Sequence, residues 1–141
     1  MLLNLRRFFG WGVNSNITGS GGNNLIYTDS TKIWSVFDNI IYNAIKHTTA
    51  GGITITAELI ADNSVITITD TGCGIAPEHL PFVFERFYRG VAERGTKTGE
   101  SGLGLYIVKS IMEGCSGNVG IESQVGFGTT VFVTFKGRSG E

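Results

Sequence analysis

The hydrophobic residues of this chain change their spacing from a helical period to strict alternation, and this change limits the folds open to it. After Asp29 or Ser30, either of which is a plausible N-cap, apolar residues recur at helical spacing, namely Ile33, Val36, Phe37, Ile40, Ile41, Ala44 and Ile45. Residues 53–59 and 65–69 then alternate with a period of two, and residues 61–64 join them. The sequence therefore predicts a helix followed by a β-hairpin.

The second half contains helix and hairpin patterns on either side of a long polar segment. A short helix is expected over 77–86, and residues 89–101 show no hydrophobic period, which favours a mobile functional loop. A further helix over 102–113 and strands over 118–123 and 129–135 follow. This order predicts an α/β (α+β) fold, a two-layer sandwich with a mixed, mostly antiparallel sheet and helices on one face.

Composition excludes several broad classes of protein. The 141 residues are one domain's worth, and no apolar run approaches the ~18 residues of a membrane span. Charged residues make up 16% and balance to a net charge of −1, which argues against a nucleic-acid binder. The spacing of the two cysteines indicates neither a zinc site nor a set of disulfides. A reducing, cytoplasmic location is therefore expected.

The glycine-rich and asparagine-rich start of the chain indicates a domain boundary. We expect residues 1–26 to be an N-terminal segment and linker, with 14–24 as flexible linker or loop. The working domain is then 27–141.

A polar stripe runs along the first expected helix. Asn39, Asn43 and Lys46 stand at i, i+4 and i+7 and share one face, and His47 follows at the end of the helix. A solvated face would explain this stripe. Alternatively, an asparagine carbonyl would help to hold Mg²⁺, which prefers oxygen ligands, and the lysine would neutralise phosphate oxygens.

A carboxylate and two glycines end the second strand of the expected hairpin. Asp70 continues the register of Ile66 and Ile68, so its side chain is expected on the apolar side. Such an aspartate can be a turn cap. It can equally accept a hydrogen bond from an exocyclic amine, with Gly72 and Gly74 letting the backbone approach a flat ring.

Two further motifs flank the long loop. Gly102 and Gly104 open a helix, a position whose free N–H groups and dipole suit an anion, although neither a Rossmann fingerprint nor a P-loop is present. In the run 84–89, Phe-Glu-Arg-Phe-Tyr-Arg, the phenylalanines are expected in the core. Arg86 and Arg89 would reach phosphate or form surface ion pairs.

Taken in order, these motifs resemble the ATP-binding catalytic domain of sensor histidine kinases, in the GHKL (Bergerat-fold) ATPase class. The resemblance covers about residues 27–135. The matching motifs are the N box at 39–48, the first glycine box at 70–75, the F box at 84–89, the second glycine box at 101–105 and the closing glycine turn at 126–130.

The resemblance implies a role for each matching residue. It implies that Asn43 coordinates Mg²⁺ and that residues 89–101 form an ATP lid. Residues near the metal or phosphates would be Asn39, Lys46, Arg89, Ser101, Gly102, Leu103, Gly104 and Leu105. Residues around the adenine and ribose would be His47, Asp70, Gly72, Gly74, Tyr88 and Thr129.

One position separates kinases from hydrolases in this class. Relatives that hydrolyse ATP place a glutamate base one turn before the metal asparagine, where this chain has Asn39. Asp38 lies about 140° around the helix from Asn43 and is poorly placed to substitute. The chain is therefore expected to be an ATP-dependent histidine kinase domain that transfers the γ-phosphoryl group to an imidazole.

The acceptor histidine is expected on another domain. The only histidines, His47 and His79, do not match the phosphoacceptor motif, so the chain is interpreted as an isolated catalytic domain or fragment. It would be a monomer, would make no membrane contact, and would act on a histidine-bearing dimerisation domain and, indirectly, a response regulator. The alternatives are a nucleotide-binding regulatory module without phosphotransfer and a protein-serine kinase of the anti-sigma type.

Overall fold

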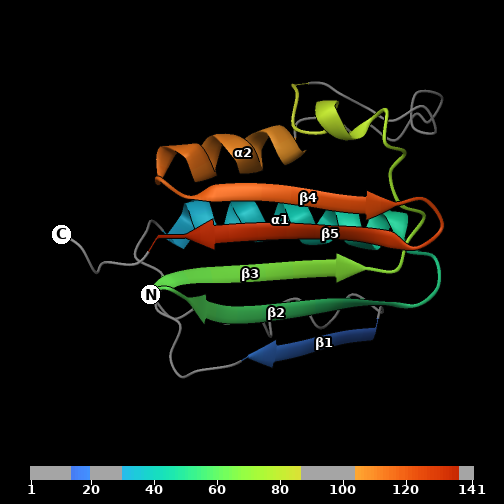
Figure 1. Ribbon diagram of the computed structural model, residues 1–141, viewed down its shortest axis with the longest axis horizontal. Helices are drawn as coiled ribbons and strands as arrows, with labels where there is room; N and C mark the ends of the chain where they lie inside the picture. The colour runs from blue at the N-terminus through green and yellow to red at the C-terminus, as the bar shows by residue number, and fades with distance from the viewer. Residues whose placement is uncertain (1–13, 20–29, 87–103, 137–141) are drawn as a thin grey trace.

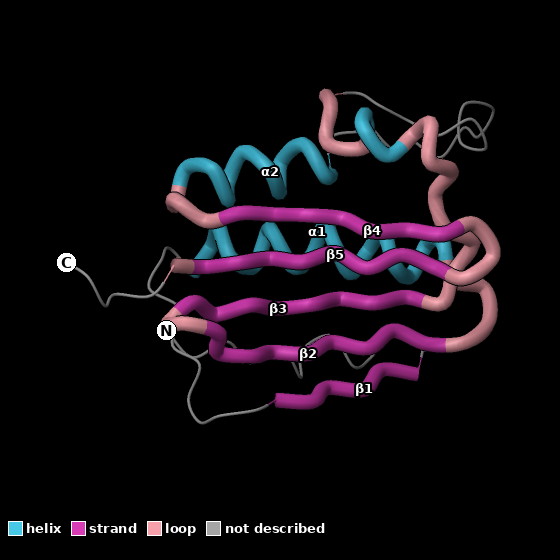
Figure 2. Tube along the Cα trace, viewed as in Figure 1, coloured by secondary structure: helices cyan, strands magenta, loops and turns pink. Residues whose placement is uncertain are grey.

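The computed structural model describes residues 14–19, 30–86 and 104–136. They form one sheet of five strands in the order β1-β2-β3-β5-β4, with both long helices on one face (Figure 1, Figure 2). The elements are β1 (Asn14–Gly19), α1 (Ser30–His47), β2 (Gly52–Ile60), β3 (Asn63–Asp70), the 3-10 helix η2 (Leu80–Phe82), α2 (Gly104–Gly114), β4 (Asn118–Gln124) and β5 (Gly128–Phe135). Because β1 is parallel to β2 and the other pairs are antiparallel, the expected two-layer sandwich with a mixed sheet is confirmed.

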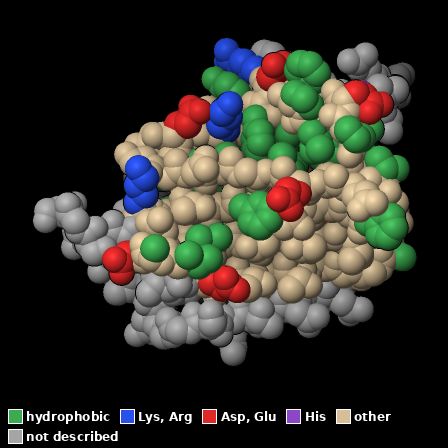
Figure 3. Space-filling model, in the orientation of Figure 1, with side chains coloured by type: hydrophobic (Ala, Val, Ile, Leu, Met, Phe, Trp, Pro, Cys, Tyr) green, Lys and Arg blue, Asp and Glu red, His purple; other side chains and the backbone are tan. Residues whose placement is uncertain are grey.

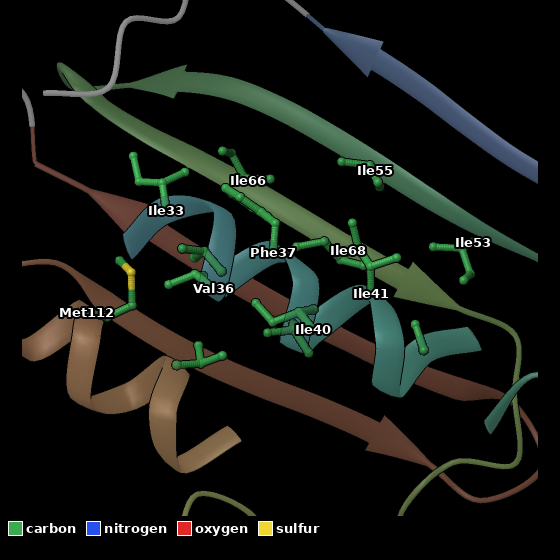
Figure 4. Close-up of a cluster of buried hydrophobic side chains, with 14 of the residues drawn as sticks. Ile33, Val36, Phe37, Ile40, Ile41, Ile53, Ile55, Ile66, Ile68 and Met112 are labelled. Carbon is green, nitrogen blue, oxygen red and sulfur yellow. The ribbon is translucent and has the colours of Figure 1, made fainter. Parts of the chain in front are cut away.

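The core lies between the helices and the inner face of the sheet (Figure 4). The apolar stripe of α1 enters it, as the spacing predicted, and Phe37 is fully buried with its ring centroid 6.5 Å from that of Phe135. Burial of each such side chain contributes about 1.5–3 kcal/mol. The buried cluster is Ile33, Val36, Phe37, Ile40, Ile41, Ala44, Ile53, Ile55, Ile66, Ile68, Val108, Met112, Val131, Val133 and Phe135.

The hairpin between β2 and β3 sets which side chains enter this core. Its turn consists of Ala61 and Asp62, whose φ angles of 48° and 68° are both positive, as in the two-residue turns that match strand twist. The burial of β3 then alternates strictly along the strand. Asp70 is on the buried side with Ile66 and Ile68, as predicted. The opposite face of the sheet, seen in Figure 3, carries the intervening residues of β3 such as Thr67 and Thr69.

The linker interpretation of residues 14–24 is wrong for Asn14–Gly19. These residues form β1, an edge strand that pairs in parallel with β2 from Asn14 opposite Gly52 to Gly19 opposite Ala57. The backbone supplies the hydrogen bonds of a sheet edge, so a strand there does not require the alternating apolar pattern used to find the others.

The helix expected over 77–86 is also wrong. The segment consists of turns with one short 3-10 helix, η2. Pro81 lacks an amide proton and lies in the middle of the segment, so an α-helix there would lose a hydrogen bond. A chain of turns instead carries the segment past β4, which η2 contacts.

Gly126 in the β4–β5 turn, compared with Gly120 within β4, tests how much the turn depends on backbone conformation. Gly126 has a φ of 84°, whereas Gly120 has no such constraint, and a Cβ at either position would meet only open space. We expect Gly126→Ala to lower the free energy of unfolding by about 1 kcal/mol, because only the left-handed conformation opposes it. Gly120→Ala should leave stability unchanged or slightly raised. Chemical denaturation of both variants checks this, and equal effects would contradict it.

Candidate functional site

A row of polar side chains crosses the inner face at one end of the sheet. In the strand register Asp70 of β3 lies opposite Thr129 of β5, which lies opposite Ser123 of β4. Each residue continues the inward-facing positions of its strand, which are otherwise apolar near the core. The row therefore closes the core at this end with groups that can form hydrogen bonds.

Asp70 is the buried charged group of this row, with only 7% of its surface exposed. The backbone N–H of Gly72 donates to its Oδ1 at 2.9 Å, and the backbone of Thr129 forms a further hydrogen bond to it. Burial raises the pKa of Asp70 above its ordinary value, while these two hydrogen bonds and the nearby His47 oppose the rise. A carboxylate is thus held in a costly position and fixed in orientation.

The turn after Asp70 is wedged between two other segments. A Cβ on Gly72 would lie 2.3 Å from the backbone oxygen of His47, and one on Gly74 would lie 2.2 Å from that of Gln124. The N–H of Cys73 donates to the same His47 oxygen at 3.2 Å. Both glycines are therefore needed for the backbone to pass, and the turn is fixed against the last residue of α1.

The polar stripe of α1 faces the N-terminus of α2. A Cβ on Gly104 would lie 3.3 Å from Asn39 Oδ1 and 3.7 Å from Asn43 Nδ2. Asn39 Nδ2 donates to the backbone oxygen of Ser35 at 2.7 Å, which fixes the side-chain amide. Lys46 and His47 form the last turn of the same helix, and Leu105 is half-buried in the first turn of α2. The amide pair therefore lies on α1 itself, and the turn with Gly72 and Gly74 packs against the last residue of the same helix.

The amide pair suits a hard divalent cation. Asparagine carbonyls are oxygen ligands, and Mg²⁺ binds through one or two protein oxygens while keeping waters and substrate phosphates. In the parts of the chain that are described, no three His, Cys, Asp or Glu side chains come together to hold a metal. Asn39 Oδ1 and the Asn43 amide beside Gly104 nevertheless offer an oxygen donor of the kind that Mg²⁺ uses together with water and phosphate.

Several expected site residues lie outside the described residues, namely Tyr88, Arg89, Ser101, Gly102, Leu103 and the segment 89–101. The two described ends that flank this segment contact each other. The guanidinium of Arg86 lies 5.5 Å from the ring centroid of Tyr106 in α2, a cation–π contact.

Comparison with known proteins decides the family. The family described as histidine kinase-, DNA gyrase B-, and HSP90-like ATPase matches residues 28–139. The chain belongs to this family. Within it, the similarity is to sensor histidine kinases: RppB of Synechocystis sp. is 40% identical over 111 residues, which are 78% of this chain and 24% of RppB.

Solved structures agree with this assignment. The mycobacterial sensor histidine kinase MprB has a TM-score of 0.76 at 27% identity, covering 88% of this chain and 83% of that one. Full-length ShkA, solved in complex with AMPPNP, has a TM-score of 0.76 at 28% identity, covering 92% of this chain and 26% of that one. The chain is therefore an ATP-binding catalytic domain of the histidine kinase type with the Bergerat fold.

The domain spans only 14% to 24% of the lengths of the first three curated relatives. Among the described residues, neither helix is long and apolar enough to cross a membrane.

Sequence reasoning missed Ser123. Its hydroxyl accepts from the N–H of Ile75 at 2.7 Å, donates to the backbone oxygen of Gly128 at 3.0 Å and lies 2.8 Å from Thr129 Oγ1. The signal was present, because Val119, Ile121 and Ser123 repeat the pattern of two apolar residues followed by a polar one that singled out Asp70.

Proposed function

We propose that this domain binds Mg²⁺-ATP and transfers the γ-phosphoryl group to a histidine on a separate dimerisation and phosphoacceptor domain in two-component signalling. The observation that carries the proposal is the double role of α1. Its amides Asn39 and Asn43 face Gly104 at the start of α2, and its last carbonyl, on His47, receives the turn that follows Asp70. A single helix therefore connects a phosphate end and a base end of one site.

At the base end, Asp70 accepts a hydrogen bond from the adenine amino group. Its burial makes it an acceptor without competing water, and its two backbone hydrogen bonds aim it. Gly72 and Gly74 lie beside the ring, with Thr129, His47 and Tyr88 completing this end of the pocket. Burying the charged carboxylate of Asp70 costs stability, and such a cost is typical of a group that is retained for binding.

At the phosphate end, positive charge and backbone N–H groups meet the triphosphate. Lys46 and Arg89 neutralise phosphate oxygens, Asn39 lies near them, and the residues from Ser101 to Leu105 supply the start of α2. Asn43 would contribute an amide oxygen to Mg²⁺, and the ion would neutralise charge on the phosphates. The protein's own contribution is positioning and charge.

The nucleophile is the neutral imidazole of the acceptor histidine. Its nitrogen lone pair attacks the γ-phosphorus, the bond to the bridging oxygen breaks, and ADP leaves with that electron pair. Water is a poor competitor because Asn39 stands where a carboxylate base would be needed, and Asp38 is exposed on another side of α1. Transfer is therefore favoured over hydrolysis.

The partner domain follows from the chemistry of the chain. Neither histidine of the sequence precedes an acidic residue, so the acceptor is supplied by a histidine-bearing domain, with a response regulator receiving the phosphoryl group later. The domain alone acts in the cytoplasm as a monomer, without contact to nucleic acid or membrane. A regulatory module without transfer, or a serine kinase of the anti-sigma type, would use the same pocket.

Calorimetric titration with a non-hydrolysable ATP analogue, with and without Mg²⁺, is the first test. One-site binding that strengthens with Mg²⁺ is expected, and absence of binding would overturn the proposal. Incubation with labelled ATP and the phosphoacceptor domain of a related sensor kinase then separates the activities. Acid-labile label that disappears when the acceptor histidine becomes alanine supports histidine transfer, whereas acid-stable label indicates a serine kinase. Binding without label indicates a regulatory module.

A further inference from the structure

The Ser123 hydroxyl has three polar neighbours at hydrogen-bond distance. They are the N–H of Ile75 at 2.7 Å, the backbone oxygen of Gly128 at 3.0 Å and Oγ1 of Thr129 at 2.8 Å. A serine hydroxyl has one proton to donate and two lone pairs that accept. The three contacts therefore use its full capacity.

The directions of these hydrogen bonds follow from the partners. The Ile75 amide can only donate, and the Gly128 carbonyl can only accept, so the single Ser123 proton is directed to Gly128. The remaining contact must then run from the Thr129 hydroxyl to the Ser123 oxygen. The Thr129 hydroxyl thereby uses its only proton. Toward a ligand it can only accept hydrogen bonds, through its lone pairs.

Thr129 lies directly opposite Asp70 in the strand register. An ionised carboxylate also offers lone pairs alone. This end of the proposed site therefore presents two neighbouring acceptors and no side-chain donor from the pair. Such a pair matches a base edge that carries an amino group and opposes one that carries a carbonyl oxygen.

We propose that Ser123 is a positioning residue that fixes the direction of the Thr129 hydroxyl and so makes the site select 6-amino purines over 6-oxo purines. This role rests on the proposed ATP site. Ser123 itself need not touch the nucleotide, because it acts through the proton of Thr129. The selectivity of the site is then built into β4 as well as into the residues beside the base.

The variant Ser123→Ala removes the acceptor that holds the Thr129 proton. Thr129 can then donate to the 6-oxo oxygen of inosine triphosphate, so the ratio of the Kd for inosine triphosphate to the Kd for ATP should fall about 3- to 10-fold. Ser123→Thr keeps a hydroxyl and should restore the ratio of the native chain. If Ser123 had a merely structural role, Ser123→Ala would weaken the binding of both nucleotides alike and leave the ratio of the two Kd values unchanged. Calorimetry with each Mg²⁺-nucleotide measures both constants.

A matched hydroxyl pair on the other sheet face supplies the control. Thr69 Oγ1 lies 3.2 Å from Thr130 Oγ1, one residue along β5 from Thr129. Thr69→Ala also removes one member of a hydroxyl pair, but its side chain points away from the site. Its ratio of dissociation constants should equal that of the native chain, and a matching drop would overturn the assigned role of Ser123.

The outcomes separate this proposal from the one on which it rests. A native chain that binds no ATP overturns the proposed function, whereas a native chain that binds ATP with a ratio unchanged by Ser123→Ala overturns only the role of Ser123. If Ser123→Ala does not fold, Thr129→Val provides the test. It should weaken the binding of ATP about 3- to 10-fold and weaken the binding of inosine triphosphate less, because the 6-amino group loses an acceptor whereas the 6-oxo oxygen has none to lose. Equal weakening of both would overturn the proposal.

Discussion

Replacing Asn43 with alanine should abolish the strengthening of ATP binding by Mg²⁺ and lower the rate of phosphoryl transfer by about 100-fold or more. The amide of Asn43 lies beside Gly104 at the start of α2, where the phosphates of a nucleotide would lie in the proposed site. Loss of residues that only support a metal ligand already costs about 10- to 100-fold in affinity or activity, so loss of the ligand itself should lie at the upper end. Titrations with and without Mg²⁺, and transfer assays, measure both effects.

A matched substitution distinguishes the loss of a metal ligand from the general effect of replacing an asparagine with alanine. Asn118 is exposed on β4, at the end of that strand remote from Ser123, and Asn118→Ala should leave binding and transfer unchanged. Binding without Mg²⁺ should be nearly the same in Asn43→Ala as in the native chain, because the base end is intact. Mg²⁺-dependent binding at native strength in Asn43→Ala would show that the metal assignment is wrong.

The elements that pack on the core were predictable from the sequence because their apolar spacing is set by that packing. The helix α1, the β2–β3 hairpin and the last two strands all place one apolar face on the same cluster. The edge strand β1 and the turns around η2 were not predicted. Their positions depend on backbone hydrogen bonds and on Pro81, which leave no periodic pattern in the side chains.

The candidate site was predictable to the same extent and for a related reason. Asp70 was found because a carboxylate interrupts an inward-facing apolar series. Ser123 interrupts a corresponding series, but a serine is uncharged and common at strand ends, so the same signal is weaker. Its role depends on three contacts to residues that are distant from it or across a turn, and only the folded chain brings them together.

Replacing Asp70 should separate binding from stability. Asp70→Asn should weaken ATP binding by about 10- to 100-fold, since a charged acceptor to the adenine amino group is lost and an amide N–H₂ can take its place. The ratio of affinities for ATP and inosine triphosphate should fall as well. Asp38→Asn removes one exposed charge from α1 and provides the control, for which no change in binding is expected.

The stability of the same variant should depend on pH in a defined direction. Because burial raises the pKa of Asp70 in the folded chain, its contribution to stability is fully present below the unfolded pKa and is lost as pH rises through the folded pKa. The asparagine has no such loss, so the unfolding free energy of Asp70→Asn relative to the native chain should increase from acid to neutral pH. Thermal unfolding at both pH values measures this. A variant that bound ATP at native strength, or that lost relative stability as pH rose, would contradict the view that Asp70 is kept for its ligand at a cost to the fold.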